Sequence, residues 1–306
     1  MFEITLDSVD RYKYFRDVQI WPLTDEFNFH GWLSNFKGNS DDFKIACRIL
    51  DFFNYYPKNM VDQMLIASVG HAGYELSKHF LDWKHSDFKK RSIYSFIPGE
   101  TQNTSDSGYL FTRKLRESLG IDQNQFIDYK DLHDTLENIK TPIPIIFVDD
   151  FIGSGSQCYK AWKINRNGNN NRTLEEIHKI YGHIFVYCPL LVNYKGHKII
   201  KDHCPELILS PAHIIGEEYD LFNPNCICWK NEEGLDLYTQ GIEMILRKSR
   251  ELGIPFTNGK CVYDAKGFGE QGLALAFEHG APDAIPAFFY WCSDNWTPLI
   301  KKTYQR

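Results

Sequence analysis

The stretch IIFVDDFIGSGSQ, residues Ile145 to Gln157, decides the fold of this 306-residue chain. Its first four residues are apolar, which is typical of a buried parallel strand. Asp149 and Asp150 follow directly, and a short run of glycine and serine then leads into a helical pattern. In open α/β sheets, ligands bind at the carboxyl ends of the strands. The stretch therefore predicts a strand, a ligand-binding turn and a helix in succession.

The alternation of strand and helix continues on both sides of this stretch. We expect strands at SIYSFI, QFIDY, PIIFVDD, HIFVYCPLLV and ELILSPAHII, and helices near Gly108 to Leu119, Lys130 to Ile139, Gln157 to Ile164 and Lys198 to His203. Repeated strand–helix units predict an α/β fold, in which helices flank both faces of a mostly parallel sheet. This core spans residues 92–215.

Two further zones flank the predicted core. Residues 1–91 form a mainly helical zone that we expect to pack on the core, because apolar residues recur at helical spacing from about Ser40 to Trp83. Residues 216–306 contain a helix near Leu235 to Leu252 and then an aromatic-rich stretch, which we expect to cap the sheet. These aromatic residues suit core packing better than a stacking lid over a bound base.

Composition and charge limit the class of protein. A hydrophobic fraction of 43% with 24% charged residues excludes collagen-like and disordered chains. No apolar run approaches the roughly 20 residues that a membrane span needs, and the acidic N-terminus lacks a secretory signal, so we expect a cytoplasmic protein without membrane association. The net charge of -6 argues against direct binding of nucleic acid. The eight cysteines are scattered without a second metal-binding pair, so we expect reduced thiols and no structural zinc.

The turn after the two aspartates has the chemistry of a phosphate site. Gly153 and Gly155 let the backbone turn tightly, and the N–H groups from Ser154 to Gln157 can converge on one phosphate at the helix N-terminus. The hydroxyl groups of Ser154 and Ser156 add donors. Two carboxylates beside such a site repel each other unless the ligand supplies hydroxyl donors or a metal ion. A ribose phosphate with a bound metal ion supplies both.

The whole stretch resembles the phosphoribosyl diphosphate (PRPP) binding motif of type I phosphoribosyltransferases. The shared pattern is four hydrophobic residues, two acids, two variable residues and a phosphate loop rich in glycine and hydroxyl groups. The resemblance implies that Asp149 and Asp150 are the catalytic pair and bind the ribose 2′ and 3′ hydroxyls, while Gly153 to Gln157 bind the 5′-phosphate. It also implies Mg²⁺, held mainly through the ligand, and a displacement at the anomeric carbon.

Three other segments are similar to one branch, the PRTase-CE proteins, which are phosphoribosyltransferase-like proteins encoded in bacterial conflict (antiphage) gene neighbourhoods. The segments are WLSNF (Trp32 to Phe36), SDSG (Ser105 to Gly108), and FEHGAPDAIPAFFYW (Phe277 to Trp291) with the NWTPLI that follows. The resemblance implies a role in antiphage defence and a protein partner from a defence operon. One departure is that His279 to Pro286 replace an asparagine-rich string, so no base-recognition role is assigned there.

The site of the leaving diphosphate also departs from the type I pattern. These enzymes commonly use a loop after the first sheet strand together with basic residues, but the loop here, Pro98 to Gly108, contains no Lys or Arg. We expect the diphosphate side to be formed by the segment after Asn103 and by the next helix, at Thr104, Ser105, Asp106, Ser107, Gly108 and Arg113. An equal alternative is that Ser105 to Gly108 only cap that helix, with Asp106 or Ser107 as an ordinary N-cap.

Two other functions remain open beside a phosphoribosyltransferase. A non-catalytic sensor or interaction module would keep the site to bind PRPP or a nucleotide, which the missing basic residues in the diphosphate loop favour. An N-glycosidic hydrolase would act on nucleosides or nucleotides, with water in place of the acceptor base. Release of diphosphate or of free base distinguishes these functions.

Overall fold

The computed structural model describes residues 6–18, 20–22, 26–99, 107–230 and 237–302. The chain forms two compact units: unit 1 comprises Met1–Val61 and Gly216–Arg306, and unit 2 comprises Asp62–Ile215. Unit 2 is thus inserted into the sequence of unit 1. The boundaries between the two units lie after residues 61 and 215. The boundaries between the zones predicted from the sequence lie after residues 91 and 215.

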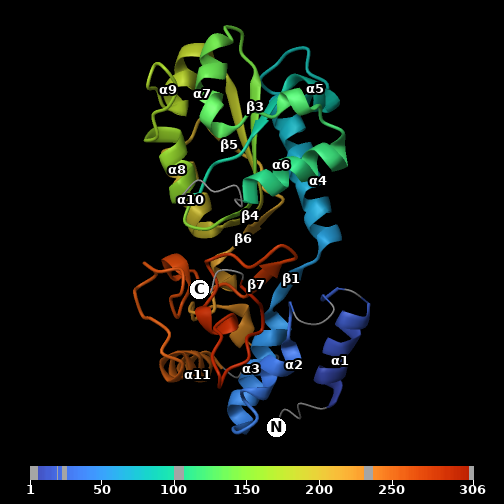
Figure 1. The fold of residues 1–306 in the computed structure, drawn as a ribbon, viewed down its shortest axis with the longest axis vertical. Helices are drawn as coiled ribbons and strands as arrows, with labels where there is room; N and C mark the ends of the chain where they lie inside the picture. Colours follow the sequence, from blue (N-terminus) through green and yellow to red (C-terminus); the bar gives the residue numbers. More distant parts are fainter. Residues whose placement is uncertain (1–5, 19, 23–25, 100–106, 231–236, 303–306) are drawn as a thin grey trace. The chain divides into compact units, whose positions relative to one another are not determined.

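Unit 2 is an α/β unit in which helices flank a parallel sheet (Figure 1). Its strands are β2 (Ile93–Ser95), β3 (Pro144–Ile152), β4 (Ile184–Asn193), β5 (Ile208–Leu209) and β6 (His213–Ile215). Its helices are α4 (Lys58–Leu76, which begins in unit 1), α5 (Phe88–Arg91), α6 (Ser107–Leu119), α7 (Tyr129–Asn138), α8 (Ser156–Lys163), α9 (Leu174–Tyr181) and α10 (Tyr194–His203). The predicted fold class is confirmed.

The sheet runs in the order β2-β3-β4-β5, with β6 also paired to β4, and every pair is parallel. β3 therefore lies between β2 and β4. Along the β3–β4 pair, Phe147 lies opposite Tyr187 and Asp149 opposite Pro189. Because side chains alternate along a strand, Asp149 lies on the same face of the sheet as Phe147 and Tyr187.

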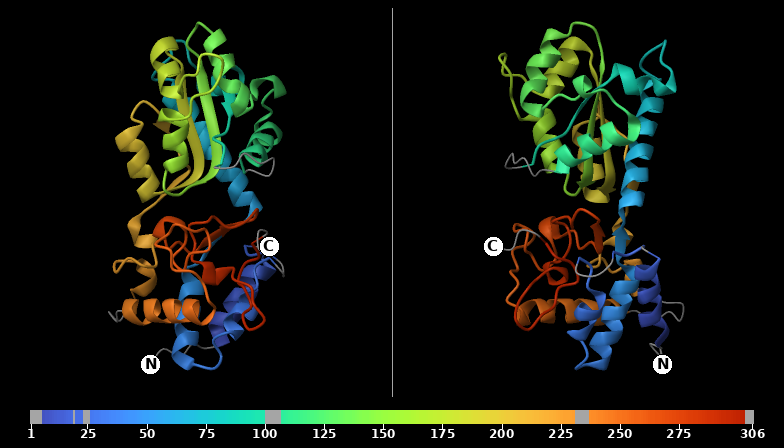
Figure 2. Two further views of the ribbon diagram at one scale, coloured as in Figure 1. Left: turned by 60° about the vertical axis from the view of Figure 1, so that its left-hand side comes forward. Right: turned by 45° about the vertical axis from the view of Figure 1, so that its right-hand side comes forward.

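Both faces of β3 are covered, which is why its first half is uniformly apolar. Ile145 to Val148 have no exposed surface. Helices α7, α8 and α9 lie on one side of the sheet, and α4 and α6 lie on the other (Figure 2). On the first side, Trp162 of α8 packs edge-on against Phe185 of β4, with ring centres 5.1 Å apart. This core fixes the strand whose end carries the two aspartates.

Some predicted elements differ from the observed ones. QFIDY is not a strand, because only Phe126 forms an isolated bridge, to Tyr94. ELILSPAHII contains two short strands, β5 and β6, since Pro211 lies between them and lacks the N–H that a continuous ladder needs. The sequence patterns also missed α9, where Thr173 and Glu176 cap the helix reciprocally.

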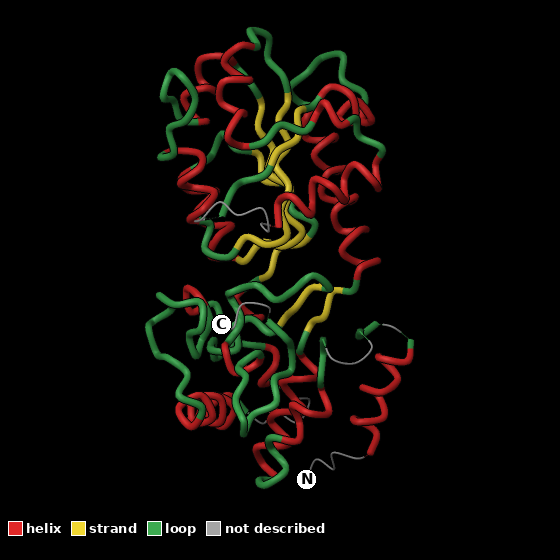
Figure 3. The backbone as a smooth tube through the Cα atoms, in the orientation of Figure 1, coloured by secondary structure: helices red, strands yellow, loops and turns green. Residues whose placement is uncertain are grey.

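Unit 1 joins segments from both ends of the chain. Its elements are α1 (Leu6–Asp17), α2 (Phe29–Ser34), α3 (Ser40–Phe52), β1 (Asn54–Tyr56), α11 (Tyr238–Glu251) and β7 (Leu275–Phe277). β1 pairs with β7 in parallel. Most of the chain after α11 is loop (Figure 3).

The aromatic residues of this loop-rich part form a core. Phe288 and Phe289 are fully buried, and the ring of Trp32 in α2 lies 5.7 and 5.8 Å from their ring centres. Core packing of these aromatic residues is therefore observed. It brings together two of the segments that resemble PRTase-CE proteins.

No helix among the described residues combines the length and the apolar character that crossing a membrane requires.

Candidate functional site

The candidate site lies where β3 passes through a glycine turn into α8. β3 ends at Ile152, and α8 begins at Ser156, one residue before the predicted helix start. Of the predicted phosphate turn, Gly153, Ser154 and Gly155 form the link between strand and helix, and Ser156 and Gln157 are the first two residues of α8. Gly155 precedes the helix in the left-handed conformation, with φ of 77°, which a residue with a side chain rarely adopts.

A second helix start lies against this turn. A Cβ atom on Gly155 would lie 3.0 Å from the carbonyl oxygen of Gly196, in the first turn of α10. A Cβ atom on Gly196 would lie 2.5 Å from the carbonyl oxygen of Gly153. Both glycines are therefore needed for the close approach of the two segments. Gly196 was not among the predicted site residues, because no local pattern shows that a helix following another strand approaches the turn.

The helix starts give this region the character of an anion site. The first N–H groups of a helix have no acceptor within it, and the helix dipole adds partial positive charge there. The Ser154 hydroxyl donates to the Ser156 hydroxyl at 3.0 Å and accepts the Ser156 N–H at 3.3 Å. The two hydroxyl groups thus lie together at the start of α8, where both can turn toward a bound phosphate.

The two aspartates occupy different environments. Asp149 is 7% exposed, and the Tyr187 hydroxyl donates to its Oδ2 at 2.6 Å. The backbone N–H of Asp150 donates to its Oδ1 at 2.9 Å. Asp150 is half-buried, and its Oδ1 accepts the N–H of Phe151 at 2.8 Å. Asp150 is therefore the more exposed carboxylate of the pair.

Burial and the neighbouring negative charge both raise the pKa of Asp149. Burial first, and then the negative charge of Asp150, raise the pKa of Asp149 well above its ordinary value, while the hydrogen bond from Tyr187 opposes the rise. Burial and the charge of Asp149 also raise the pKa of Tyr187 well above its ordinary value. Tyr187 is consequently a protonated donor at neutral pH. Tyr187 was not among the predicted site residues, because no pattern within a single strand shows which residue of the neighbouring strand lies beside it.

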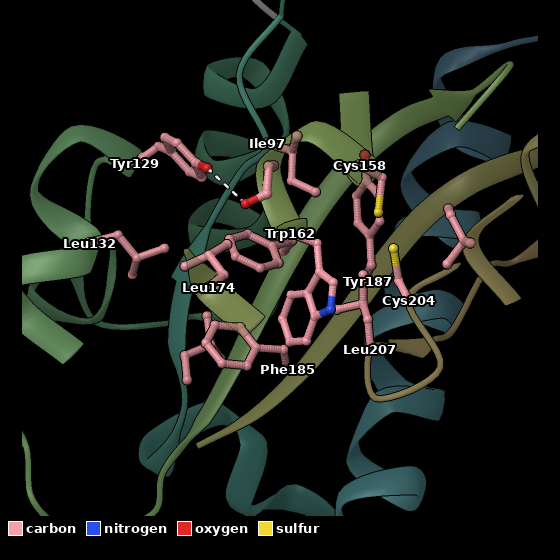
Figure 4. Packing of buried hydrophobic residues seen from close by; sticks show 14 of the residues in the cluster. Ile97, Tyr129, Leu132, Cys158, Trp162, Leu174, Phe185, Tyr187, Cys204 and Leu207 are labelled. Carbon is pink, nitrogen blue, oxygen red and sulfur yellow. Dashed lines mark hydrogen bonds between the residues drawn. The ribbon is translucent and has the colours of Figure 1, made fainter. Parts of the chain in front are cut away.

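Beneath the turn, the helices are anchored in the core of unit 2 (Figure 4). Cys158 of α8 and Cys204, the residue after α10, are both buried. The Cys204 thiol, together with burial, raises the pKa of Cys158. Cys158 is therefore a packed thiol on a helix that contacts α10.

The predicted diphosphate side is described only in part. Thr104, Ser105 and Asp106 lie outside the described residues, and Ser107 and Gly108 form the start of α6. Gly108 packs against the ring of Phe96, which a Cβ atom would approach to 2.4 Å.

Arg113 lies further along α6, where its side chain is 70% exposed and pairs with Glu117 at 2.9 Å. Lys114, beside it, pairs with Asp62 at 2.9 Å. The basic groups of α6 nearest to the loop thus have carboxylate partners.

The residues present fit Mg²⁺ of the kind that the resemblance implies. Mg²⁺ prefers hard oxygen ligands and is usually bound by one or two carboxylates together with substrate phosphates. The half-buried carboxylate of Asp150, at the edge of the phosphate turn, would supply one such ligand. Within the described ranges, no three His, Cys, Asp or Glu side chains gather into a metal-binding group.

Comparison with known proteins identifies the family. No curated protein gives a significant match to the chain. The sequence model of the PRTase-CE family matches residues 29–302, a range that includes β3, the phosphate turn, α8 and the paired aromatic segments of unit 1. The chain, with its parallel sheet and its acidic pair ahead of a glycine turn, therefore belongs to the PRTase-CE family of phosphoribosyltransferase-like proteins.

Proposed function

We propose that the protein binds PRPP, or a related ribose 5-phosphate nucleotide, together with Mg²⁺ at the carboxyl end of β3, and that it transfers the phosphoribosyl group at the anomeric carbon. One observation carries the proposal: an acidic pair is followed directly by a glycine turn that opens a helix, at the end of a strand inside a parallel sheet. Membership of the PRTase-CE family supports it.

Each part of the ligand has a matching group in the site. The 5′-phosphate would accept hydrogen bonds from the backbone and hydroxyl groups of Gly153 to Gln157. The ribose hydroxyls would donate to Asp150, the more exposed member of the acidic pair. A hydrogen bond to a charged group contributes about 1.5–3 kcal/mol, so loss of the Asp150 charge should weaken binding by roughly one to two orders of magnitude.

The reaction requires positioning more than a protein nucleophile. The bond from C1′ to the diphosphate oxygen breaks, its electron pair leaves with the diphosphate, and a bond from C1′ to a nitrogen of the acceptor base forms, while that nitrogen releases its proton to solvent. Positive charge develops on the ribose ring, and the carboxylate of Asp150 would stabilise it when it binds the ribose hydroxyls. Bound Mg²⁺ would neutralise charge on the departing diphosphate. The turn against α10 holds the 5′ end of the sugar in place.

Ligand-dependent melting of the full chain tests the binding step. Ligand at about 100 times its dissociation constant adds roughly 2.7 kcal/mol of stability, which raises the melting temperature by a few degrees. We expect this shift with PRPP and Mg²⁺, and we expect Asp150→Asn to lose it. Asp202→Asn, which removes one carboxylate from an exposed position near the end of α10, is the matched control and should keep the shift. No shift of the wild type with PRPP, ribose 5-phosphate or AMP would refute the proposal.

Turnover separates the proposed transferase from the other candidates. A transferase releases diphosphate from PRPP only when an acceptor base is present, whereas a hydrolase releases free base from a nucleotide without diphosphate. A sensor binds and releases neither product. The sensor is the second candidate, because the Arg113 guanidinium already pairs with Glu117 on an exposed helix face.

Family membership also supports a proposed role in antiphage defence, with a protein partner from the same operon. We expect cells that carry the wild-type gene to give fewer phage plaques than cells that carry Asp149→Asn/Asp150→Asn. Equal plaque numbers at equal protein levels would contradict this role.

A further inference from the structure

Tyr187 lies at the centre of a buried contact that the proposed chemistry does not itself require. Its side chain is 1% exposed, and its ring stands perpendicular to that of Phe147, with centres 6.4 Å apart. Packing thus fixes the plane of the ring, and the plane fixes the direction of the hydroxyl group. That hydroxyl donates to Oδ2 of Asp149 at 2.6 Å.

The other oxygen of Asp149 is also engaged, because Oδ1 accepts the backbone N–H of Asp150 at 2.9 Å. The carboxylate of Asp149 is thus held at both oxygens by groups of the protein. A carboxylate held in this way is fixed in orientation, whereas the half-buried Asp150 retains more contact with solvent. The two acids therefore have different roles, although the sequence presents them as equivalent neighbours.

We infer that Tyr187 is a positioning residue: its hydroxyl anchors Asp149 in the core, so that Asp149 supports the strand end while Asp150 meets the ligand. This inference rests on the proposed function for its ligand, but the Tyr187–Asp149 contact itself is present without one. Tyr187 comes from β4, so the neighbouring strand controls the acidic pair of β3.

Removal of the Tyr187 hydroxyl takes away the hydrogen bond at Oδ2 of Asp149. The carboxyl group then loses the contact that fixes it to β4, while the backbone N–H of Asp150 still donates to its Oδ1. We therefore expect the surroundings of Asp149 to change in a variant that lacks this hydroxyl.

Tyr187→Phe tests the inference, with Tyr129→Phe as the matched control. Tyr129 lies in the same core, is equally buried, and its hydroxyl donates to the carbonyl oxygen of Ala161 at 3.5 Å rather than to a carboxylate (Figure 4). Carbon-13 carboxyl NMR of the ligand-free chain at one fixed pH reports the surroundings of Asp149, whose resonance is the one missing in Asp149→Asn. We expect its chemical shift to change in Tyr187→Phe and to stay unchanged in Tyr129→Phe. An unchanged chemical shift in both variants would overturn the inference.

Calorimetric titration with PRPP and Mg²⁺ provides the second readout. We expect Tyr187→Phe to bind about tenfold more weakly than the wild type. Equal affinities of Tyr187→Phe and Tyr129→Phe would overturn the inference. If the wild type binds no ribose phosphate, the proposed function fails, while the NMR chemical shift still decides whether Tyr187 positions Asp149.

A double variant keeps the test decisive if Tyr187→Phe does not fold. The failure to fold then has one of two causes: the Asp149 carboxylate has lost its partner, or the hydroxyl group itself is needed for folding. With Asp149→Asn in the background, the buried charge is gone, and we expect Tyr187→Phe to fold. Failure to fold in both backgrounds would show that the hydroxyl acts independently of Asp149, and the inference would be wrong.

Discussion

Asp149 places a carboxylate in the core of unit 2, where a charge is costly. Transfer of a carboxylate out of water disfavours the ionised form unless hydrogen bonds compensate. Tyr187 and the N–H of Asp150 supply two such bonds, but burial and the neighbouring charge still raise the pKa of Asp149. The residue thus lowers stability at neutral pH, as is common for residues retained for function.

The stability cost of Asp149 should depend on pH. An unfolded aspartate titrates near pH 4, and the folded pKa of Asp149 is raised above that value. Asp149 therefore causes no loss of stability below about pH 4, and the free energy of unfolding falls as the pH rises from there through the folded pKa. We expect Asp149→Asn to melt a few degrees above the wild type at pH 8, with a smaller gap at pH 5. Melting curves across this range, with Asp202→Asn as control, measure the effect; a gap that widens toward acid would contradict it.

The sequence predicted the site residues better than their roles. The order of apolar residues, aspartates and glycines along Ile145 to Gln157 is local, so it showed where strand, turn and helix lie. That Asp149 faces Tyr187 depends on the register between two strands, which no local pattern contains. The buried role of Asp149 could therefore come only from the structure.

At the scale of elements, the start of α10 supports the phosphate turn. Gly196 allows the two segments to touch, because any side chain at this position would meet the carbonyl oxygen of Gly153. Backbone atoms cannot move aside as the end of a flexible side chain can. The shape of the turn thus depends on a helix that follows a different strand.

We expect Gly196→Ala to destabilise the chain by about 1–3 kcal/mol through overpacking and to weaken PRPP binding. Gly70→Ala is the matched control, since Gly70 lies inside α4 and an added Cβ has no neighbour within 4 Å. Replacing glycine inside a helix by alanine stabilises by roughly 0.5–1 kcal/mol, so the two variants should change stability in opposite directions. Urea unfolding measures the free energy of unfolding of both variants. A Gly196→Ala variant that is as stable as the wild type would contradict the close contact between Gly196 and Gly153.

The elements missed by the sequence analysis share a physical cause. In QFIDY, a short apolar run favoured a strand, but only Phe126 pairs with the sheet. The helix α9 follows an asparagine-rich loop and is short, so its pattern was weak although Thr173 and Glu176 form a capping box. Short elements depend on tertiary contacts more than on local preference.

At the scale of the molecule, family resemblance extends across both units. Trp32 joins the two ends of the chain, because its fully buried ring packs on Phe288 and Phe289 in unit 1. The family match from residue 29 to residue 302 covers this contact as well as the phosphate turn in unit 2. The packing of unit 1 is thus part of what the family pattern records.

We expect Trp32→Ala to destabilise unit 1 by about 3–5 kcal/mol. Hydrogen exchange should then speed up in peptides around Leu275–Phe277 and Phe288, whereas peptides of β3 and β4 should keep their protection. Trp32→Phe retains a ring, and among the described residues the indole N–H has no hydrogen-bond acceptor to lose, so its effect should be smaller. Equal loss of protection in both units would show that their cores are not separate.

The insertion of unit 2 within unit 1 determines the order in which the parts can form during synthesis. All of unit 2 precedes the roughly 90 residues after Ile215, which at about 5–20 residues per second take roughly 5–18 s to add. β1 needs β7, and Asn54 pairs with Leu275, so unit 1 must wait for nearly the whole chain. In that interval the first 61 residues expose an aromatic surface whose partners have not yet been made, and the nascent N-terminal segment, rather than the sheet, is where a chaperone would be needed.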